Sequence, residues 1–357
     1  MRLQARLVPQ SEGRFTRSCA MVVSLLIACG LVVSCSSEGP AEGEVVLYTS
    51  MPDDVVDRLE GVIERRFPDL DGNLWITMGS GISLTVVRGR TADIQELIAS
   101  EVNNGGIRAD LIWLAEPSPY ETYKNMGLLA PYEPPLEAPI LPSHIDADGF
   151  YVAGRIISMV IAWNTSLWPE GLADWPDLQN VELNAFPAPE SGAARATIKA
   201  LTDKYGREFF TTLASVGGVS VRSNGAARDG VAEGTFEAVA VLDYMARDAK
   251  AAGSAIDFVY PAGGTVSIPS PIAITTDAPN PAAARAVIDF ILSQPGQKIL
   301  VEIGNFYPVR SDVAPPVGAP PLDAITALDV DWKELAGEID AISTLWESLY
   351  GTSVGSG

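Results

Sequence analysis

The chain has 357 residues, of which 47% are hydrophobic and 19% charged, and its formal net charge is −21. This length allows two domains of ordinary size, each with a substantial core. The strong negative charge argues against nucleic acid as a partner, because phosphate backbones are bound by basic surfaces, whereas a local group of arginines can still attract a small anion.

Residues 1–34 are predicted to be a lipoprotein signal peptide. Four arginines precede a short apolar run, a pattern typical of an export signal; a transmembrane anchor is the alternative. The residues before Cys35 (VVSC) resemble the lipobox of bacterial lipoproteins, so Cys35 is the expected lipidation site, followed by a soluble tether over residues 35–43. Cleavage before Cys29 is the alternative, but it would leave the apolar residues 30–33 at the new N-terminus.

The rest of the chain lacks the motifs of several enzyme classes. All three cysteines precede residue 36, so the body has no disulfide, no thiolate metal site and no thiol nucleophile. The phosphate-loop, dinucleotide-binding and His-Glu-x-x-His motifs are absent, as is a Ser-x-x-Lys helix start. His144, beside Asp146, is the only histidine and is expected to lie on the surface without a role. We therefore expect a protein that is not an enzyme and has no cofactor.

Strands and helices alternate over the first part of the body. Strands are expected at residues 44–48, 82–87 and 110–114, helices at 53–67 and 91–103 with a short one ending at 127, and a loop at 69–80. This alternation predicts a parallel sheet with helices on its faces. In such sheets ligands bind at the carboxyl ends of strands, here at residues 49–52, 88–91 and 115–118.

A long extended run at residues 150–163 is predicted to cross into a second domain. Helices are expected there at 193–201 and 204–214, with another beginning at 223–225, and extended segments at 219–222, 236–242 and 255–260. Residues 265–275 form a plausible second crossover, followed by helices at 281–293 and within 323–350.

Arginines recur beside glycines and small hydroxyl residues at predicted strand ends and helix starts. Free N–H groups at a helix start, together with an arginine, favour an anion such as phosphate. The alternative is that the serines are ordinary helix caps and the arginines pair with this chain's many carboxylates. The groups are Arg88, Arg90 and Thr91; Ser191, Gly192 and Arg195; and Arg222, Ser223, Asn224 and Gly225, with Arg155 on the predicted crossover.

The mature chain resembles the extracellular solute-binding proteins of the ferric-iron/phosphonate branch of bacterial ABC importers. The segments that carry the resemblance are VVLYTS (45–50), VVRGRT (86–91), ADLIW (109–113), GLLAPY (127–132), AWNT (162–165), PESG (189–192), YPAGGTVSIPS (260–270), APNPAAA (278–284), FILSQPGQ (290–297) and NFYPVR (305–310). The resemblance implies a type II periplasmic-binding-protein fold, with two α/β lobes of mixed sheet and helices joined by two crossover strands. Lobe 1 is expected at residues 44–149 and 265–357, and lobe 2 at residues 150–264.

The resemblance also implies a function: capture of a small anionic solute between the lobes and its delivery to a membrane permease. Iron-binding members hold Fe³⁺ with paired tyrosines, often with a histidine and a glutamate. Here Tyr244 stands without a second tyrosine, Met51 occupies the histidine position, and Glu116 is one residue out of step with the glutamate. Asp243 or Tyr244 is expected to hold a cationic or hydroxylated end of the ligand.

We therefore expect a phosphonate or phosphate ester as ligand; Fe³⁺ bound by Tyr244 and Glu116, or another organic anion, is the alternative. The protein is expected to be an exported, lipid-anchored monomer on the bacterial cell membrane (periplasmic or outer face). A lipid-tethered hydrolase and an adhesion or scaffold module are the rival classes. The predicted ligand-binding residues are Thr49, Ser50, Arg88, Arg90, Thr91, Glu116, Arg155, Ser191, Gly192, Arg195, Ser223, Asn224, Asp243 and Tyr244.

Overall fold

Strands from distant parts of the chain meet in one mixed sheet. The computed structural model describes residues 43–64, 81–135 and 138–351, all of which belong to one compact unit. Among these residues the strands pair in the order β2-β1-β3-β9-β4-β7-β5-β6, and β8 also pairs with β4. The strands are β1 (Gly43–Thr49), β2 (Ile82–Arg88), β3 (Leu111–Trp113), β4 (Val152–Asn164), β5 (Asn184–Pro187), β6 (Val219–Val221), β7 (Ala238–Leu242), β8 (Ile256–Val259) and β9 (Ser267–Ile274).

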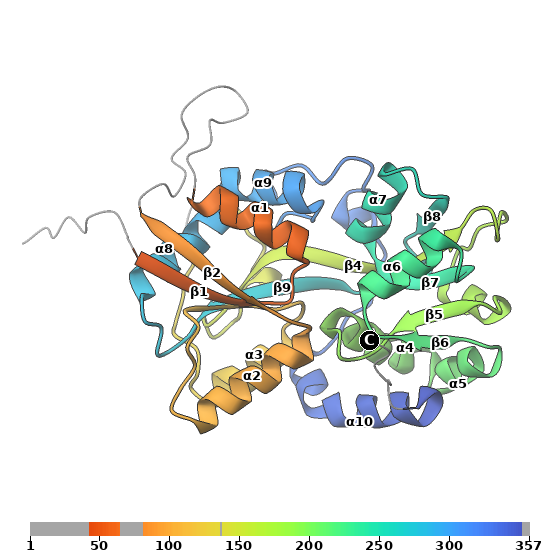
Figure 1. The fold of residues 1–357 in the computed structure, drawn as a ribbon, viewed down its shortest axis with the longest axis horizontal. Coiled ribbons are helices and arrows are strands. Elements are labelled where there is room, and N and C mark those ends of the chain that lie inside the picture. The colour runs from red at the N-terminus through yellow and green to blue at the C-terminus, as the bar shows by residue number, and fades with distance from the viewer. Residues whose placement is uncertain (1–42, 65–80, 136–137, 352–357) are drawn as a thin grey trace, which may run out of the picture. The chain divides into compact units, whose positions relative to one another are not determined.

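Helices lie on both sides of this sheet. Figure 1 shows α1 and α9 above its left half with α2 and α3 below, and α6 and α7 above its right half with α4, α5 and α10 below. The α-helices are α1 (Asp53–Glu64), α2 (Thr91–Asn103), α3 (Ser118–Asn125), α4 (Gly192–Tyr205), α5 (Glu208–Ser215), α6 (Asn224–Glu233), α7 (Asp243–Ala251), α8 (Pro281–Leu292), α9 (Gln294–Gly304) and α10 (Trp332–Tyr350). Short 3₁₀ helices are Pro142–His144, Trp175–Asn180 and Leu322–Ala324.

Two long strands, β4 and β9, join the two halves of the sheet. The first part of β4 pairs antiparallel with β9, and its second part pairs with β7 and β8. On its other edge β9 pairs with β3, so both strands belong to the junction (Figure 1). The predicted α/β fold with two crossover strands is confirmed. We call the half containing β1, β2 and β3 lobe 1, and the half containing β5, β6, β7 and β8 lobe 2.

Parallel pairing brings the loops that follow the strands to one edge in each lobe. In lobe 1 the last residues of β1, β2 and β3 are in register, with Thr49 opposite both Arg88 and Trp113. In lobe 2 β5 pairs parallel with both β6 and β7. Apolar, β-branched runs such as Val45 to Leu47 form these strands because their side chains fit a buried pleated surface.

Several helices differ from the expectation, and α7, which follows β7 directly, was not predicted. The helix expected at residues 204–214 is divided, because Gly206 has a φ of 78° and ends α4 before α5 begins. The sequence pattern also missed α9. Ser293 ends α8 and at the same time caps α9, since its hydroxyl accepts a hydrogen bond from the N–H of Gly296 at 3.1 Å.

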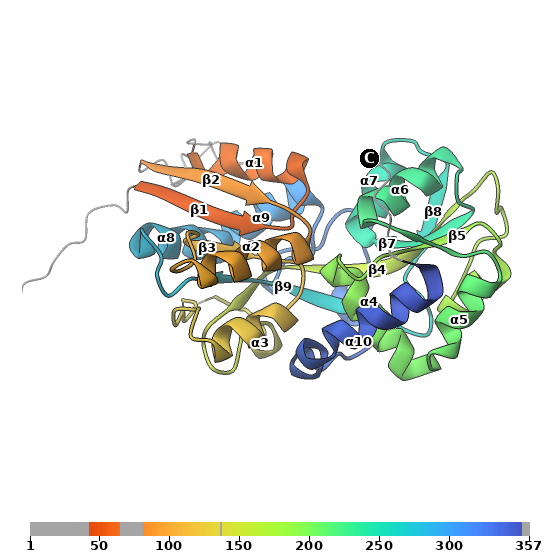
Figure 2. The same cartoon turned by 60° about the horizontal axis from the view of Figure 1, so that its bottom comes forward.

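The C-terminal helix α10 contacts both lobes (Figure 2), whereas the expected division placed it with lobe 1. It packs against α3 of lobe 1 and against α4 and α5 of lobe 2. Trp346 is buried beside Phe186 and Phe210, and its indole N–H donates to the hydroxyl of Ser220 at 2.7 Å. Aromatic packing therefore attaches α10 to lobe 2, an arrangement that chain position does not reveal.

Several predictions concern residues outside the described part of the chain. The signal peptide, Cys35 and nearly all of the tether fall within residues 1–42, and the loop expected at 69–80 falls within 65–80. Over the described residues, no helix combines the length and apolar character needed to cross a membrane.

Candidate ligand-binding site

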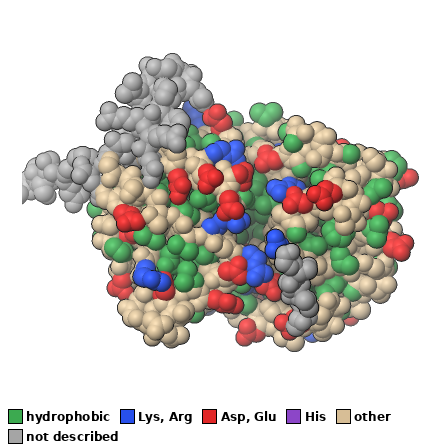
Figure 3. All heavy atoms as spheres, in the orientation of Figure 1, with side chains coloured by type: hydrophobic (Ala, Val, Ile, Leu, Met, Phe, Trp, Pro, Cys, Tyr) green, Lys and Arg blue, Asp and Glu red, His purple; other side chains and the backbone are tan. Residues whose placement is uncertain are grey.

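A cleft of about 1380 Å³ lies between the two lobes. It is lined by the loops that follow β1, β2 and β6, by the start of α4 and by residues of β4 and α7. Acidic and basic side chains are interleaved along it (Figure 3). Ten of the predicted ligand-binding residues line this cleft: Ser50, Arg88, Arg90, Thr91, Arg155, Ser191, Gly192, Ser223, Asn224 and Tyr244.

The four other predicted residues do not line the cleft, and each already has a protein partner. The Thr49 hydroxyl donates to the carbonyl of Trp113 at 2.8 Å. Asp243 accepts from the N–H groups of Ser158 and Tyr244 and pairs with Arg247 at 3.0 Å. These two side chains therefore stabilise the walls of the cleft.

Glu116 and Arg195, the remaining two, form a buried ion pair between the lobes. Glu116 follows β3 in lobe 1, Arg195 lies in the first turn of α4 in lobe 2, and Oε1 and Nη2 are 2.7 Å apart. Glu116 also accepts hydrogen bonds from the N–H and the hydroxyl of Ser118. Arg195 was expected to face the ligand. In the structure it does not line the cleft, and its charge is neutralised by Glu116.

Close packing at Gly192 makes this pairing possible. A Cβ at this position would lie 2.7 Å from Cγ of Glu116 and 3.1 Å from the hydroxyl oxygen of Thr91. The absence of a side chain lets the start of α4 approach lobe 1 directly. Ser191, the N-cap residue, makes no capping hydrogen bond with its side chain and lines the cleft. In contrast, Ser223 caps α6 by accepting from the N–H of Ala226 at 3.1 Å.

Arg155 reaches the cleft from an irregular point in β4. The register with β9 shifts between Ala153 and Arg155, which leaves Gly154 as an extra residue. Such a bulge bends the strand and redirects its side chains. Only glycine fits there, because a Cβ would lie 2.6 Å from the Trp113 ring. The backbone and the indole together direct Arg155, and Ile157 two residues later, to the same cleft.

The Arg155 guanidinium is buried, and no carboxylate of the described part of the chain pairs with it. The side chain is 2% exposed, stacks on Phe306 at 4.2 Å and also lies over the Trp113 ring. Its Nε donates to the hydroxyl of Ser270 at 3.2 Å, whereas Nη1 has no hydrogen-bond partner. Burial lowers the pKa of Arg155 to about 10, so the group stays cationic at neutral pH. An unpaired buried charge is costly unless a ligand supplies its partner.

The other arginines of the cleft differ in whether they form an ion pair with a carboxylate. Arg88 pairs with Asp53 at 3.0 Å, and Arg90 with Asp93 at 2.7 Å. The third paired one is Arg228, which contacts Asp229 at 2.7 Å. Among the described residues Arg222, like Arg155, forms no ion pair, although Arg222 also lines the cleft. Asp54, the other acidic residue of the lining, pairs with Arg58. The cleft therefore carries a net positive charge within an acidic protein.

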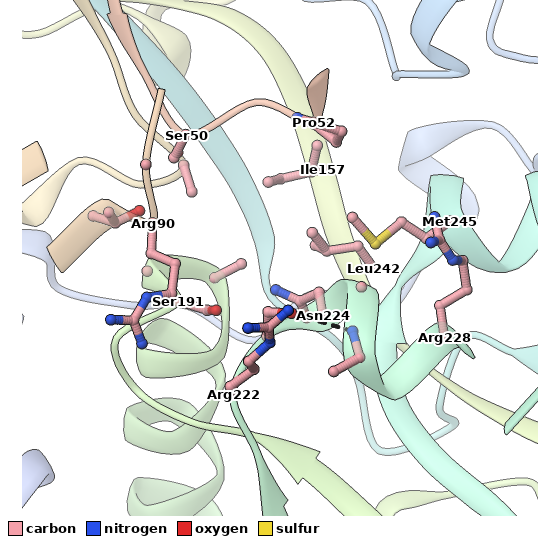
Figure 4. A pocket seen from close by; sticks show the side chains of 18 of the residues that line it. Ser50, Pro52, Arg90, Ile157, Ser191, Arg222, Asn224, Arg228, Leu242 and Met245 are labelled. Atoms are coloured by element: carbon pink, nitrogen blue, oxygen red, sulfur yellow. Dashed lines mark hydrogen bonds between the residues drawn. The ribbon is translucent and has the colours of Figure 1, made fainter. Parts of the chain in front are cut away.

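Sequence reasoning overlooked the apolar part of the lining. Pro52, Ile157, Leu242 and Met245 line the cleft beside the polar groups, and Tyr350 reaches it from the end of α10. Figure 4 shows Ser50, Pro52 and Arg90 on one side and Ser191, Arg222 and Asn224 on the other. The position of Ile157, two residues after Arg155 in one strand, was a usable signal. That of Tyr350 depends on how α10 packs, so no local pattern indicates it.

The donor set fits ferric iron poorly. Fe³⁺ favours phenolate and carboxylate oxygens, but Glu116 is paired with Arg195 and Tyr244 is nearly fully buried. Burial raises the pKa of the Tyr244 hydroxyl, which opposes the phenolate form. Over the described residues no group of three or more His, Cys, Asp and Glu side chains is arranged to hold a metal ion.

Comparison with known proteins agrees with this architecture. The model of a family described as bacterial extracellular solute-binding protein matches residues 77–327. The periplasmic binding protein P5PA is 19% identical, with a TM-score of 0.74 over 86% of this chain and 99% of that one. AfuA from Actinobacillus pleuropneumoniae with fructose-6-phosphate bound is also 19% identical, with a TM-score of 0.74 over 88% and 100% of the two chains.

An iron-bound structure is similar as well: HitA from Pseudomonas aeruginosa is 19% identical, with a TM-score of 0.73 over 86% of this chain and 99% of that one. A search of curated proteins finds no match. At these identities the solved structures establish the fold, while their bound ligands differ from one another.

Proposed function

The chain belongs to the family of bacterial extracellular solute-binding proteins, and we propose that it binds a small phosphate ester or phosphonate between its lobes for an ABC importer. Binding proteins of this family deliver solutes to a membrane permease, so the permease is the proposed protein partner. Lipidation at Cys35 is the proposed means of attachment to the membrane, with the protein acting as a monomer. No bond in the ligand is broken.

The observation that carries this proposal is the unpaired guanidinium of Arg155. Its Nη1 is buried and unbonded, and no carboxylate of the described residues pairs with it. A phosphate or phosphonate oxygen supplies both the hydrogen-bond acceptor and the negative charge. Arg222 adds a second uncompensated positive charge at the same cleft, which matches the double charge of a phosphate monoester near neutral pH.

Residues from both lobes line the cleft, and this explains how binding could lead to transport. Ser50 and Thr91 come from lobe 1, and Ser191 and Asn224 from lobe 2. A ligand that contacts both sides stabilises the state in which the lobes are closed over it. That closed state is the form proposed to dock on the permease.

The proposal is tested by thermal unfolding of the purified protein with phosphate esters, phosphonates and Fe³⁺ as separate additions. A phosphate ester at one hundred times its Kd should stabilise the folded state by about 2.7 kcal/mol. An uncharged alcohol of the same carbon skeleton should have no effect. Stabilisation by Fe³⁺ alone, with a visible charge-transfer band, would instead identify an iron carrier, and turnover of the ester would identify a hydrolase.

Two variants connect the result to the cleft. Arg155→Met should weaken phosphate-ester binding at least about 30-fold, because removal of one member of a buried charge pair costs about 2–5 kcal/mol. Arg108→Met is the matched control, since Arg108 is a largely exposed arginine paired with Glu101 and does not line the cleft. Isothermal titration calorimetry of both variants decides between a specific site and general attraction to positive charge.

A further inference from the structure

Among the described residues, three buried polar atoms of the cleft have no hydrogen-bond partner, and they differ in whether they donate or accept. Besides Nη1 of Arg155, these are the hydroxyl oxygen of Ser50 in lobe 1 and the side-chain oxygen Oδ1 of Asn224 in lobe 2. Buried polar atoms are nearly always hydrogen-bonded, so each such atom in a ligand cleft indicates a group that the ligand provides. Arg155 needs an acceptor, whereas the carbonyl oxygen of Asn224 needs a donor.

The position of Asn224 explains why the protein does not satisfy this oxygen. Asn224 is the first residue of α6 and is 7% exposed. The helix start that follows is capped by Ser223, whose hydroxyl accepts from Ala226, so Asn224 is not needed as a cap. Its side chain lies beside Arg222 in the cleft (Figure 4), and the two side chains present an amide and a cation to the same space.

The surroundings restrict what the rest of the ligand can be. Ile157, Leu242 and Met245 contribute an apolar surface to the cleft. A bare inorganic anion would satisfy the arginines but leave this apolar surface unused. An organic phosphate with a short carbon skeleton covers the apolar surface, and a hydroxyl or amino group on that skeleton donates to the amide oxygen.

We propose that Asn224 determines specificity, by accepting a hydrogen bond from a hydroxyl or amino group on the carbon skeleton of a phosphate ester or phosphonate. This inference rests on the proposed function, and it narrows the ligand class from any organic phosphate to one that carries a hydrogen-bond donor. Arg155, on the strand that joins the lobes, binds the anionic group, and Asn224 of lobe 2 accepts from the donor on the carbon skeleton. A ligand that lacks the donor leaves a buried oxygen unsatisfied and binds more weakly.

The test compares ethyl phosphate with 2-hydroxyethyl phosphate, which differ by one hydroxyl, using calorimetry on the full mature chain. The unmodified protein should bind the hydroxyl-bearing ester at least about tenfold more tightly, the usual effect of leaving a buried group unpaired. Asn224→Ala should remove this difference while still binding ethyl phosphate. Asn104→Ala, at the exposed end of α2, is the control and should keep the full difference.

The variant Asn224→Asp tests whether the amide acts through its oxygen or through its nitrogen. A carboxylate retains the acceptor oxygen, so this variant should keep the preference for the hydroxyl-bearing ester, although its charge weakens the binding of both anions. Loss of the preference in Asn224→Asp, or its survival in Asn224→Ala, overturns the role of Asn224 while leaving phosphate binding intact. Failure of the unmodified protein to bind either ester overturns both this inference and the proposed function.

Discussion

Two arginines of the cleft region, Arg155 and Arg195, are almost equally buried but have opposite electrostatic surroundings. They are 2% and 3% exposed. Arg195 contacts the carboxylate of Glu116 at 2.7 Å and the side-chain oxygen of Gln95 at 3.1 Å. Arg155 instead stacks on the Phe306 ring and donates to the hydroxyl of Ser270, and it forms no ion pair with any of the described residues. Burial alone therefore does not distinguish the two arginines. They differ because Arg195 has a counter-charge within the protein, whereas Arg155 has none among the described residues.

The difference also assigns separate roles to the two residues. The Arg195–Glu116 pair links α4 of lobe 2 to the loop after β3 of lobe 1, so we expect its removal mainly to lower the free energy of unfolding. Arg155 is held at the cleft by the bulge at Gly154 and by stacking on Phe306, so we expect its removal mainly to lower the affinity for the ligand.

The largest expected effect is that of Glu116→Gln, which removes the charge facing Arg195 and keeps the shape. The buried cation is then uncompensated, and the free energy of unfolding should fall by about 3–5 kcal/mol. Urea denaturation of the ligand-free protein measures this. The double variant Glu116→Gln/Arg195→Met should recover most of the loss. A single-variant loss below about 1 kcal/mol would contradict the stabilising role of the pair.

Gly154→Ala should act on the Arg155 side of the comparison. The added Cβ would lie 2.6 Å from the Trp113 ring, and such overpacking costs about 1–3 kcal/mol. The strand must also shift, so binding of phosphate esters should weaken as Arg155 moves. Gly337→Ala is the control, since no atom lies within 4 Å of its added Cβ and alanine is favoured inside α10. Equal stability in the two variants would argue against the tight contact.

Arg195→Met should lower the free energy of unfolding, whereas Arg155→Met should not. Arg155 carries a desolvated charge without a partner, so its replacement by an apolar side chain should leave the free energy of unfolding unchanged or raise it by about 1–2 kcal/mol. Arg195→Met leaves the Glu116 carboxylate buried and should lower it. Denaturation curves of the ligand-free variants decide this, and an equal loss in both would show that Arg155 is as well compensated as Arg195.

The smallest effect is expected at His144, which was expected on the surface but is half-buried in the structure. Burial lowers the pKa of His144, and its Nδ1 has no hydrogen-bond partner. In the unfolded state His144 takes up a proton near the ordinary histidine pKa of about 6.5, whereas in the folded state it does so only at lower pH. The free energy of unfolding should therefore decrease as the pH falls below about 6.5. Unfolding free energies of the unmodified protein and His144→Gln, measured between pH 7.5 and 5, should diverge in that direction. Parallel curves would contradict it.

Much of the architecture could be predicted from local patterns. Apolar, β-branched runs indicated β1, β2 and β4, and the helix start at Ser223 was visible from its capping residues. The loops after β1, β2 and β3 were correctly expected to meet at one edge, because parallel pairing aligns strand ends. The helix α9 was missed because Ser293 ends one helix and begins the next, which leaves no loop residues to separate them.

The sequence by itself determined most of the strands and helices, the acidic composition and the set of loops that carry arginines and serines, because these depend on local propensity and strand alternation. Only the tertiary structure decided which buried arginine has a counter-charge among the described residues. Arg195 and Glu116 are 79 positions apart, and Trp113 and Phe306 reach Arg155 from distant segments. Neutralisation of a buried charge depends on distances of a few ångströms between such segments, and these distances are set by packing.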